Sequence, residues 1–160
     1  MKVFKDYYHN TVKLVLGKEA FSKQPKHVWV ITRYQGQWLL TKHADRGTEF
    51  PGGKVEHGED AQEAAIREVK EETGGHVSRL NFIGQYYVDG KAGHIIKNIY
   101  FANVDEIEDQ EHYFETEGPV LLNDIPRNIK KDDRFSFMMK DEVLVHALKV
   151  VREKYINKEA

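Results

Sequence analysis

The residues best suited to chemistry in this sequence are three glutamates, Glu68, Glu71 and Glu72, in an acidic stretch from Gly53 to Gly74. Residues three and four positions apart share one face of a helix, so these carboxylates should lie close together. Close carboxylates beside small apolar residues are costly unless they are protonated, paired or bound to a metal. Oxygen ligands without cysteine or a histidine pair favour Mg²⁺, with Mn²⁺ as an alternative, over Zn²⁺. The pattern predicts a hard-cation site suited to phosphate chemistry.

A helix must present these glutamates. Asp60 followed three residues later by Glu63 forms a capping box, which predicts a helix that begins there and ends at Gly74. The arc that carries the three glutamates also carries small and apolar residues, namely Ala61, Ala64, Ala65, Ile66 and Val69. Glu63, Arg67 and Lys70 fall on the far side, where Glu63 and Arg67 are spaced for an ion pair. The alternative interpretation is an ordinary charged surface helix.

A known family shows the same spacing. Gly53, Glu59 and the run Arg67-Glu68-Val69-Lys70-Glu71-Glu72-Thr73-Gly74 together resemble the Nudix box of the diphosphate hydrolases. The resemblance covers about a seventh of the chain, and four spaced glutamates, one arginine and two glycines are in register. One position departs from the pattern, because Gly75 stands where the family usually has a bulky apolar residue, and Val77 is expected to supply the missing contact.

The resemblance implies both a fold and roles for these residues. The fold would be the Nudix α/β/α sandwich, an α+β arrangement with a mixed central sheet. Glu68, Glu71 and Glu72 would hold Mg²⁺, and Glu59 would hold another ion through water. Arg67 would steady the glutamates by hydrogen bonds, while Gly53 and Gly74 would supply turn geometry. The general base would be Glu68 or a glutamate of a later loop, with Glu115 the first candidate, followed by Glu117 and Glu111.

The segment that enters the box is a candidate substrate site. Glu49 to Lys54 (EFPGGK) looks like the box entry of MutT-type nucleotide hydrolases, which implies that the backbone meets the base at Phe50 and that Lys54 meets phosphate. The two glycines, Gly52 and Gly53, allow the backbone to approach a ligand closely. Lys42 is similar in context to a phosphate-contacting basic residue of that branch, although an ordinary solvated lysine is the alternative.

Strand-forming segments lie on both sides of the box. Gln35-Gly36 should form a tight antiparallel turn, and Trp29 and Trp38 are expected to pack against the sheet. The expected strands are Val3–Tyr7, Thr11–Leu16, His27–Tyr34, Gln37–His43, Leu80–Val88, Ile95–Val104 and Pro119–Leu122. Irregular connections are expected over Asp105–Glu111 and Asn123–Phe137, with core positions for Phe135 and Phe137, and a final helix over Lys140–Lys154.

Composition limits the classes of protein. The 160 residues, 40% of them hydrophobic, predict a single domain over residues 1–160. A formal net charge of -2 argues against a generally basic nucleic-acid-binding surface. There is no cysteine, no membrane-length apolar run and no apolar segment of a signal peptide near the N-terminus, so a cytoplasmic location is expected and no membrane or protein partner is inferred.

The expected function follows from the family resemblance. The first choice is Mg²⁺-dependent hydrolysis of nucleoside triphosphates, including oxidised purines such as 8-oxo-dGTP, to the monophosphate and pyrophosphate. The alternative enzyme would remove pyrophosphate from the 5′-triphosphate end of RNA and would need a groove for downstream nucleotides. A third alternative, a catalytically weak nucleotide sensor, is disfavoured because the glutamates are intact.

Overall fold

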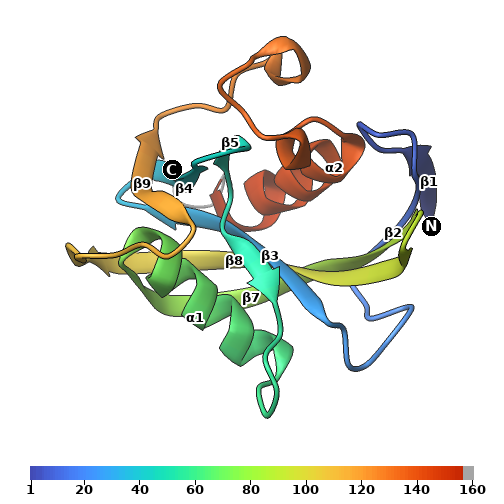
Figure 1. Ribbon diagram of the computed structural model, residues 1–160, viewed down its shortest axis with the longest axis horizontal. Coiled ribbons are helices and arrows are strands. Elements are labelled where there is room, and N and C mark those ends of the chain that lie inside the picture. Colours follow the sequence, from blue (N-terminus) through green and yellow to red (C-terminus); the bar gives the residue numbers. More distant parts are fainter. Residues whose placement is uncertain (157–160) are drawn as a thin grey trace.

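A computed structural model describes residues 1–156 and shows a twisted mixed sheet between two helices (Figure 1). The sheet has nine strands in the described part, ordered β1-β2-β7-β8-β3-β4-β5, with β6 paired to β3 and β9 paired to β4. The elements are β1 (Lys2–Lys5), β2 (Thr11–Leu16), β3 (His27–Tyr34), β4 (Gln37–His43), β5 (Gly47–Glu49), β6 (Gly52–Lys54), α1 (Ala61–Thr73), β7 (Gly75–Gly90), β8 (Gly93–Ile107), β9 (Thr116–Leu122) and α2 (Glu142–Val151). Short 3-10 turns cover Ile129–Lys131 and Phe137–Met139, and a π-helical turn covers Arg152–Ile156.

The pairing of the central strands makes the sheet mixed. β3 runs parallel to β8 along its whole length, while the other strand pairs are antiparallel. Gln35 and Gly36 both have positive φ, 47° and 76°, as a two-residue hairpin turn between β3 and β4 requires. The expected α+β fold with a mixed central sheet is confirmed.

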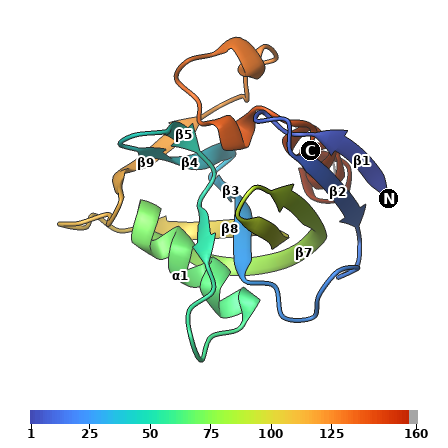
Figure 2. The same ribbon diagram turned by 45° about the vertical axis from the view of Figure 1, so that its right-hand side comes forward.

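Each helix covers one face of the sheet, as Figures 1 and 2 show from two sides. Alternation along β3 sends Val28 and Val30 towards α1, while Trp29 and Ile31 point towards α2. The α2 side forms the larger core and includes Trp29 and Trp38, which are 1% and 3% exposed, so their expected packing role is confirmed. Phe135 is buried in the same core as expected, and Phe137 is partly buried against Tyr8.

Several predicted bounds were wrong because strand pairing, rather than local composition, sets where strands end. β7 begins at Gly75, directly after the helix, and β8 runs on to Ile107 across part of the predicted loop Asp105–Glu111. The segment Gly52–Lys54 is the short strand β6, paired with β3, and β5 was not predicted. At the C-terminal end, regular helix covers only Glu142–Val151. No helix of the described residues is long and apolar enough to cross a membrane.

Candidate active site

Helix α1 positions the glutamates, and its two ends form as predicted. The Asp60 side chain accepts a hydrogen bond from the Glu63 N–H, and Glu63 accepts one from the Asp60 N–H. Gly74 ends the helix in the left-handed region at φ 76°, and a Cβ there would lie against the Glu108 carbonyl oxygen. Glycine is therefore required at this position for both its conformation and its small size.

The buried face of α1 differs from the prediction at two positions. Ala64, Ala65 and Val69 are buried as predicted, but Ile66 is 44% exposed. Arg67 does not lie on a solvated far side and does not pair with Glu63, because its guanidinium folds back over the helix start towards Glu59. Val77 packs against the same core, and the methyl groups of Val104 lie 3.2 Å from where a Cβ on Gly75 would be.

Arg67 is the centre of the acidic cluster. Its Nε and Nη2 donate to the two carboxylate oxygens of Glu59 at 2.7 and 2.9 Å, a bidentate arrangement. Its Nη1 donates to Glu68 at 2.8 Å and to Glu71 at 3.1 Å, and Nη2 also donates to the Lys54 carbonyl at 2.9 Å. Hydrogen bonding to Arg67 lowers the pKa of Glu59. The arginine thus ties the loop, the strand β6 and the helix to one another.

Of the four spaced glutamates Glu59, Glu68, Glu71 and Glu72, only Glu72 forms no ion pair with Arg67 in the described residues. Its side chain is only 8% exposed, and its Oε2 has no hydrogen-bond partner in the described residues. Burial first, and then the neighbouring Glu68 and Glu49 carboxylates, raise the pKa of Glu72 to about 10. The sequence predicted that close carboxylates beside apolar residues would be costly to ionise. That cost is largest at Glu72, which is buried and unpaired.

The donor set fits a divalent cation. Residues 1–156 contain no preformed group of three metal-binding side chains, and Glu59, Glu68 and Glu71 are paired with Arg67. The buried and unpartnered Glu72 Oε2 nevertheless belongs to a carboxylate that the neighbouring Glu68 and Glu49 carboxylates repel. A hard cation such as Mg²⁺ would remove that repulsion and match the ligand type.

The glycines of β6 make room for the carboxylates. A Cβ on Gly53 would lie 2.7 Å from the Glu68 Oε1, and a Cβ on Gly52 would lie 2.5 Å from the Val28 carbonyl oxygen. Gly52 also supplies a backbone hydrogen bond to Glu72. Close approach of β6 to α1, rather than a strained turn, therefore accounts for the glycine at position 53.

The other predicted site residues lie in different environments. The whole of Phe50 is buried, and its ring meets Trp29 and Trp38 edge-on at ring distances of 5.9 and 6.1 Å, so neither its ring nor its backbone is exposed for the expected base contact. Lys54 is exposed at the end of β6. The Lys42 ammonium is 3.4 Å from Glu117 in an exposed ion pair at the β4–β9 edge.

Glu115 lies in the turn before β9, and this turn is anchored beside the helix end. The Thr116 hydroxyl donates to the Glu72 carbonyl at 3.2 Å, and the Thr41 hydroxyl donates to the same oxygen at 3.0 Å. Glu115 is exposed, and its charge contributes to the raised pKa of Arg46. Sequence reasoning ranked Glu115 first, and the anchored turn supports keeping it as a candidate.

Arg46 and Glu49 form an ion pair that the sequence analysis did not assign. Glu49 is 3% exposed and accepts from the Arg46 Nε and Nη2 at 3.0 and 2.9 Å. After burial and the Glu68 carboxylate, its charge adds to the raised pKa of Glu72. An acidic residue directly before the buried Phe50 was the available sequence signal.

Lys97 was also missed. It interrupts the apolar run of β8, and the described residues provide no carboxylate within ion-pair distance of its ammonium. Burial lowers its pKa to about 8, and its Nζ lies 5.9 Å from the centre of the Tyr86 ring. A lysine inside an otherwise apolar strand is a signal that could have been noted from the sequence.

Comparisons with known proteins agree with this geometry. A model of the Nudix domain matches residues 23–153. The Bacillus subtilis protein YtkD, provisionally named an 8-oxo-dGTP diphosphatase, is 58% identical over 153 residues, which are 96% of this chain and 97% of that protein.

Solved structures extend the comparison. The B. subtilis pyrophosphohydrolase BsRppH, solved as a glutamate-to-alanine mutant, superposes with a TM-score of 0.96 at 56% identity, over 98% of this chain and 99% of that one. A Nudix hydrolase from Nitrosomonas europaea shares the fold with a TM-score of 0.65 at 16% identity, over 82% and 90% of the two chains. The matched domain and the carboxylate-bearing helix together establish that the chain belongs to the Nudix hydrolase family.

Proposed function

We propose that this Nudix hydrolase is a Mg²⁺-dependent pyrophosphohydrolase that converts nucleoside triphosphates, including 8-oxo-dGTP, to the monophosphate and pyrophosphate. The observation that carries the proposal is the buried Glu72 carboxylate, which has an unpartnered oxygen and lies beside Glu68. The name of the 58% identical relative supports the substrate class. When bound, Mg²⁺ would neutralise the pyrophosphate oxygens and lower the pKa of a water molecule.

Residues of the box and of β6 would bind the ion, position its ligands and leave room for the substrate. Glu68, Glu71 and Glu72 would hold the ion, with Glu59 as a further ligand through water. Arg67 would keep the glutamates in position through its hydrogen bonds, which are already formed. The glycines of β6 leave the backbone open beside the carboxylates, so a triphosphate could approach there.

Lys54 and Lys42 would contact phosphate oxygens, and the proton of the attacking water would pass to Glu68 or Glu115. Both glutamates are kept as candidates for the general base. A Glu115→Gln variant, compared with Glu106→Gln at an exposed position of β8 as the control, separates the two. If Glu115 is the base, only the first variant loses the acidic limb of the pH–rate profile; matching profiles for both variants would leave Glu68.

A second substrate class is the 5′-triphosphate end of RNA. Residues 1–54 carry ten Lys and Arg against four Asp and Glu, so the basic charge is concentrated in the N-terminal third despite the net charge of -2. Such a concentration favours contact with a polyanionic strand. The 56% identical solved structure is itself named a pyrophosphohydrolase.

A direct kinetic comparison tests the proposal. We expect kcat/KM to be highest for 8-oxo-dGTP, then dGTP, then a short 5′-triphosphorylated oligoribonucleotide, with pyrophosphate as the product released. A clear preference for the oligoribonucleotide would replace the first substrate class by the second, because remote nucleotides would then contribute to transition-state binding. Absence of Mg²⁺-dependent turnover on all three would refute both.

A further inference from the structure

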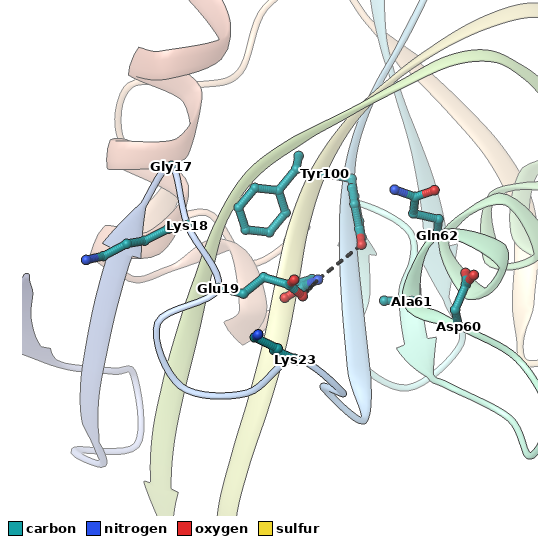
Figure 3. A pocket seen from close by; sticks show the side chains of 10 residues that line it. Gly17, Lys18, Glu19, Lys23, Asp60, Ala61, Gln62 and Tyr100 are labelled. Carbon is teal, nitrogen blue, oxygen red and sulfur yellow. Dashed lines mark hydrogen bonds between the residues drawn. The ribbon is translucent and has the colours of Figure 1, made fainter.

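A cavity of about 520 Å³ lies at the start of α1, away from the carboxylate cluster. It is a pocket open to solvent, bordered by the segment 17–23, the first turn of α1 and the strands β7 and β8 (Figure 3). The lining residues include Ala61 but none of the glutamates that Arg67 holds. Ala61 and Glu68 are separated by roughly 10 Å along the helix axis at 1.5 Å per residue. The cavity is therefore separate from the Glu68, Glu71 and Glu72 part of the candidate active site, and it borders the loop that carries Glu59 through the neighbouring Asp60.

The deep end of the cavity is a buried hydrogen-bond network. Asn98 is 1% exposed, and its Nδ2 donates to Glu19 at 3.0 Å and to the Tyr100 hydroxyl at 3.1 Å. Gln85, fully buried, donates to the Asn98 Oδ1 at 2.8 Å and accepts from the Phe21 N–H at 2.7 Å. The network ties the wall formed by segment 17–23 to the sheet, so the cavity has a fixed shape.

Two polar atoms at this end have unused bonding capacity. Tyr100 is 3% exposed, and its hydroxyl accepts from Asn98 but donates to no acceptor within residues 1–156. Burial raises the pKa of Tyr100, so its hydroxyl keeps its proton. Glu19 accepts from Asn98 through Oε2 only, which leaves Oε1 available. The Tyr100 hydroxyl can therefore donate to a ligand in the pocket, and the exposed Glu19 carboxylate, which bonds the same Asn98 amide, can accept from one.

The remaining lining defines the chemistry of a ligand. Phe82 meets Tyr100 edge-on, with ring centres 5.9 Å apart, and gives the cavity an aromatic side. Lys18 and Lys23 also line the cavity and take part in no ion pair of the described residues. Because the Glu19 carboxylate repels anions, a phosphate group would be held at the lysines, and a flat group with both a donor and an acceptor would occupy the deep end.

We propose that this cavity binds a nucleoside phosphate unit, with the base at Tyr100 and Glu19 and the phosphate at Lys18 and Lys23. Its volume falls within the range of about 300–1,000 Å³ that is typical of small-ligand pockets. The unit can come from a free nucleotide or from a downstream nucleotide of a strand whose 5′ end occupies the active site. The proposal adds a second site to the proposed function and does not depend on hydrolysis.

Calorimetry in EDTA, with GMP and AMP as probes, tests binding without turnover. We expect saturable binding of at least one probe to the wild-type chain, and a loss of about fivefold or more in affinity in Tyr100→Phe and in Lys23→Gln. Lys91→Gln, in the exposed β7–β8 turn, is the control and should bind like the wild type. Lys23 is exposed, so its replacement tests the site even if Tyr100→Phe folds poorly. No saturable binding at millimolar probe, or equal affinity in Lys23→Gln, would overturn the proposal.

Kinetics then separate the two sources of the nucleotide. If the site holds a downstream nucleotide, Lys23→Gln should lower kcat/KM for a 5′-triphosphorylated oligoribonucleotide and leave that for dGTP unchanged. Unchanged values for both substrates, together with weakened GMP or AMP binding, would assign the site to a free nucleotide. A chain that binds GMP or AMP in EDTA but hydrolyses nothing would refute the proposed function alone.

Discussion

At the scale of single residues, Arg67 and Glu72 differ in how well their polar atoms are hydrogen-bonded. Arg67 makes five hydrogen bonds that connect the box loop, β6 and α1. Glu72 is buried with an unpartnered oxygen, and its pKa is raised to about 10. The helix therefore carries one charge that is fully paired and one carboxylate that, without a cation, is stable only when protonated.

The Glu72 environment predicts a pH-dependent stability. Because its folded pKa lies above the ordinary value of 4.5, the stabilisation is complete at acidic pH and is lost as pH rises towards 10. In EDTA, urea unfolding between pH 6 and 9 should show a fall of up to about 1.4 kcal/mol per pH unit from this group. Glu72→Gln should remove that slope. Parallel pH dependences in the two proteins would show that Glu72 is not perturbed.

The same variant tests the role of Glu72 in activity. Glutamine keeps the shape of the side chain but lacks the charge that would bind the ion, so kcat should fall by at least about a hundredfold, beyond the effect typical of outer-shell partners. Steady-state kinetics at saturating Mg²⁺ would measure it, with circular dichroism as the check on folding. Near-normal turnover would exclude Glu72 as a metal ligand.

Arg67→Lys tests whether the guanidinium fork is needed. A lysine keeps the charge but cannot bond Glu59, Glu68 and Glu71 together, so the free energy of unfolding should fall by about 2 kcal/mol or more. Lys70→Ala, at an exposed position of the same helix, is the matched control and should change stability by less than about 0.5 kcal/mol. Similar losses in both variants would mean that Arg67 acts only as a surface charge.

At the scale of elements, the site depends on how closely β6 approaches α1. β6 pairs with β3 through Gly52 and Gly53, and this pairing brings its backbone beside the Glu68 carboxylate. The Thr41 and Thr116 hydroxyls meet at the Glu72 carbonyl and attach β4 and β9 to the other end of the helix. Strand–helix contacts at both ends therefore fix the position of the carboxylates.

Gly53→Ala should disturb chemistry more than folding. The added Cβ would lie 2.7 Å from the Glu68 Oε1, so the carboxylate must move, and small displacements in an active site cost about tenfold to a hundredfold in rate. Gly90→Ala is the control, since its Cβ would meet only the Gly93 carbonyl oxygen at 3.4 Å. Measurements of kcat/KM and of the melting temperature for both variants check this. A wild-type rate in Gly53→Ala would show that Glu68 can shift without consequence.

At the scale of the whole molecule, the sheet separates two functional regions from the larger core. The carboxylate cluster and the proposed nucleotide cavity both lie on the α1 side, while α2 covers the larger apolar cluster on the other face. Ligand binding on the α1 side should therefore stabilise the folded chain without rearrangement of the α2 core.

Mg²⁺ should raise the melting temperature because it binds the folded carboxylate cluster and not the unfolded chain. At a concentration one hundred times its dissociation constant, the gain is about 2.7 kcal/mol, or roughly 5–10 °C for a chain of this size. Thermal scans with Mg²⁺ and with EDTA measure the shift, and Glu72→Gln should reduce it. An equal shift in the wild type and the variant would place Mg²⁺ elsewhere.

The sequence by itself determined what depends on local spacing. The capping box at Asp60, the helix end at Gly74 and the shared face of Glu68, Glu71 and Glu72 follow from helical periodicity, which involves only neighbours along the chain. The strands around Gln35-Gly36 were likewise predictable, because two positive φ angles at a short turn fix a hairpin.

Only the tertiary structure decided which side chains are buried and what they meet. Arg67 pairs with Glu59 instead of Glu63. Phe50 packs in the core against two tryptophans, and Glu72 is buried away from solvent. Each outcome depends on β6 pairing with β3 and on α1 packing across the sheet, which are contacts between segments distant in sequence. Local propensity carries no information about such contacts, and the environment of a charge depends on them more than on its position in a motif.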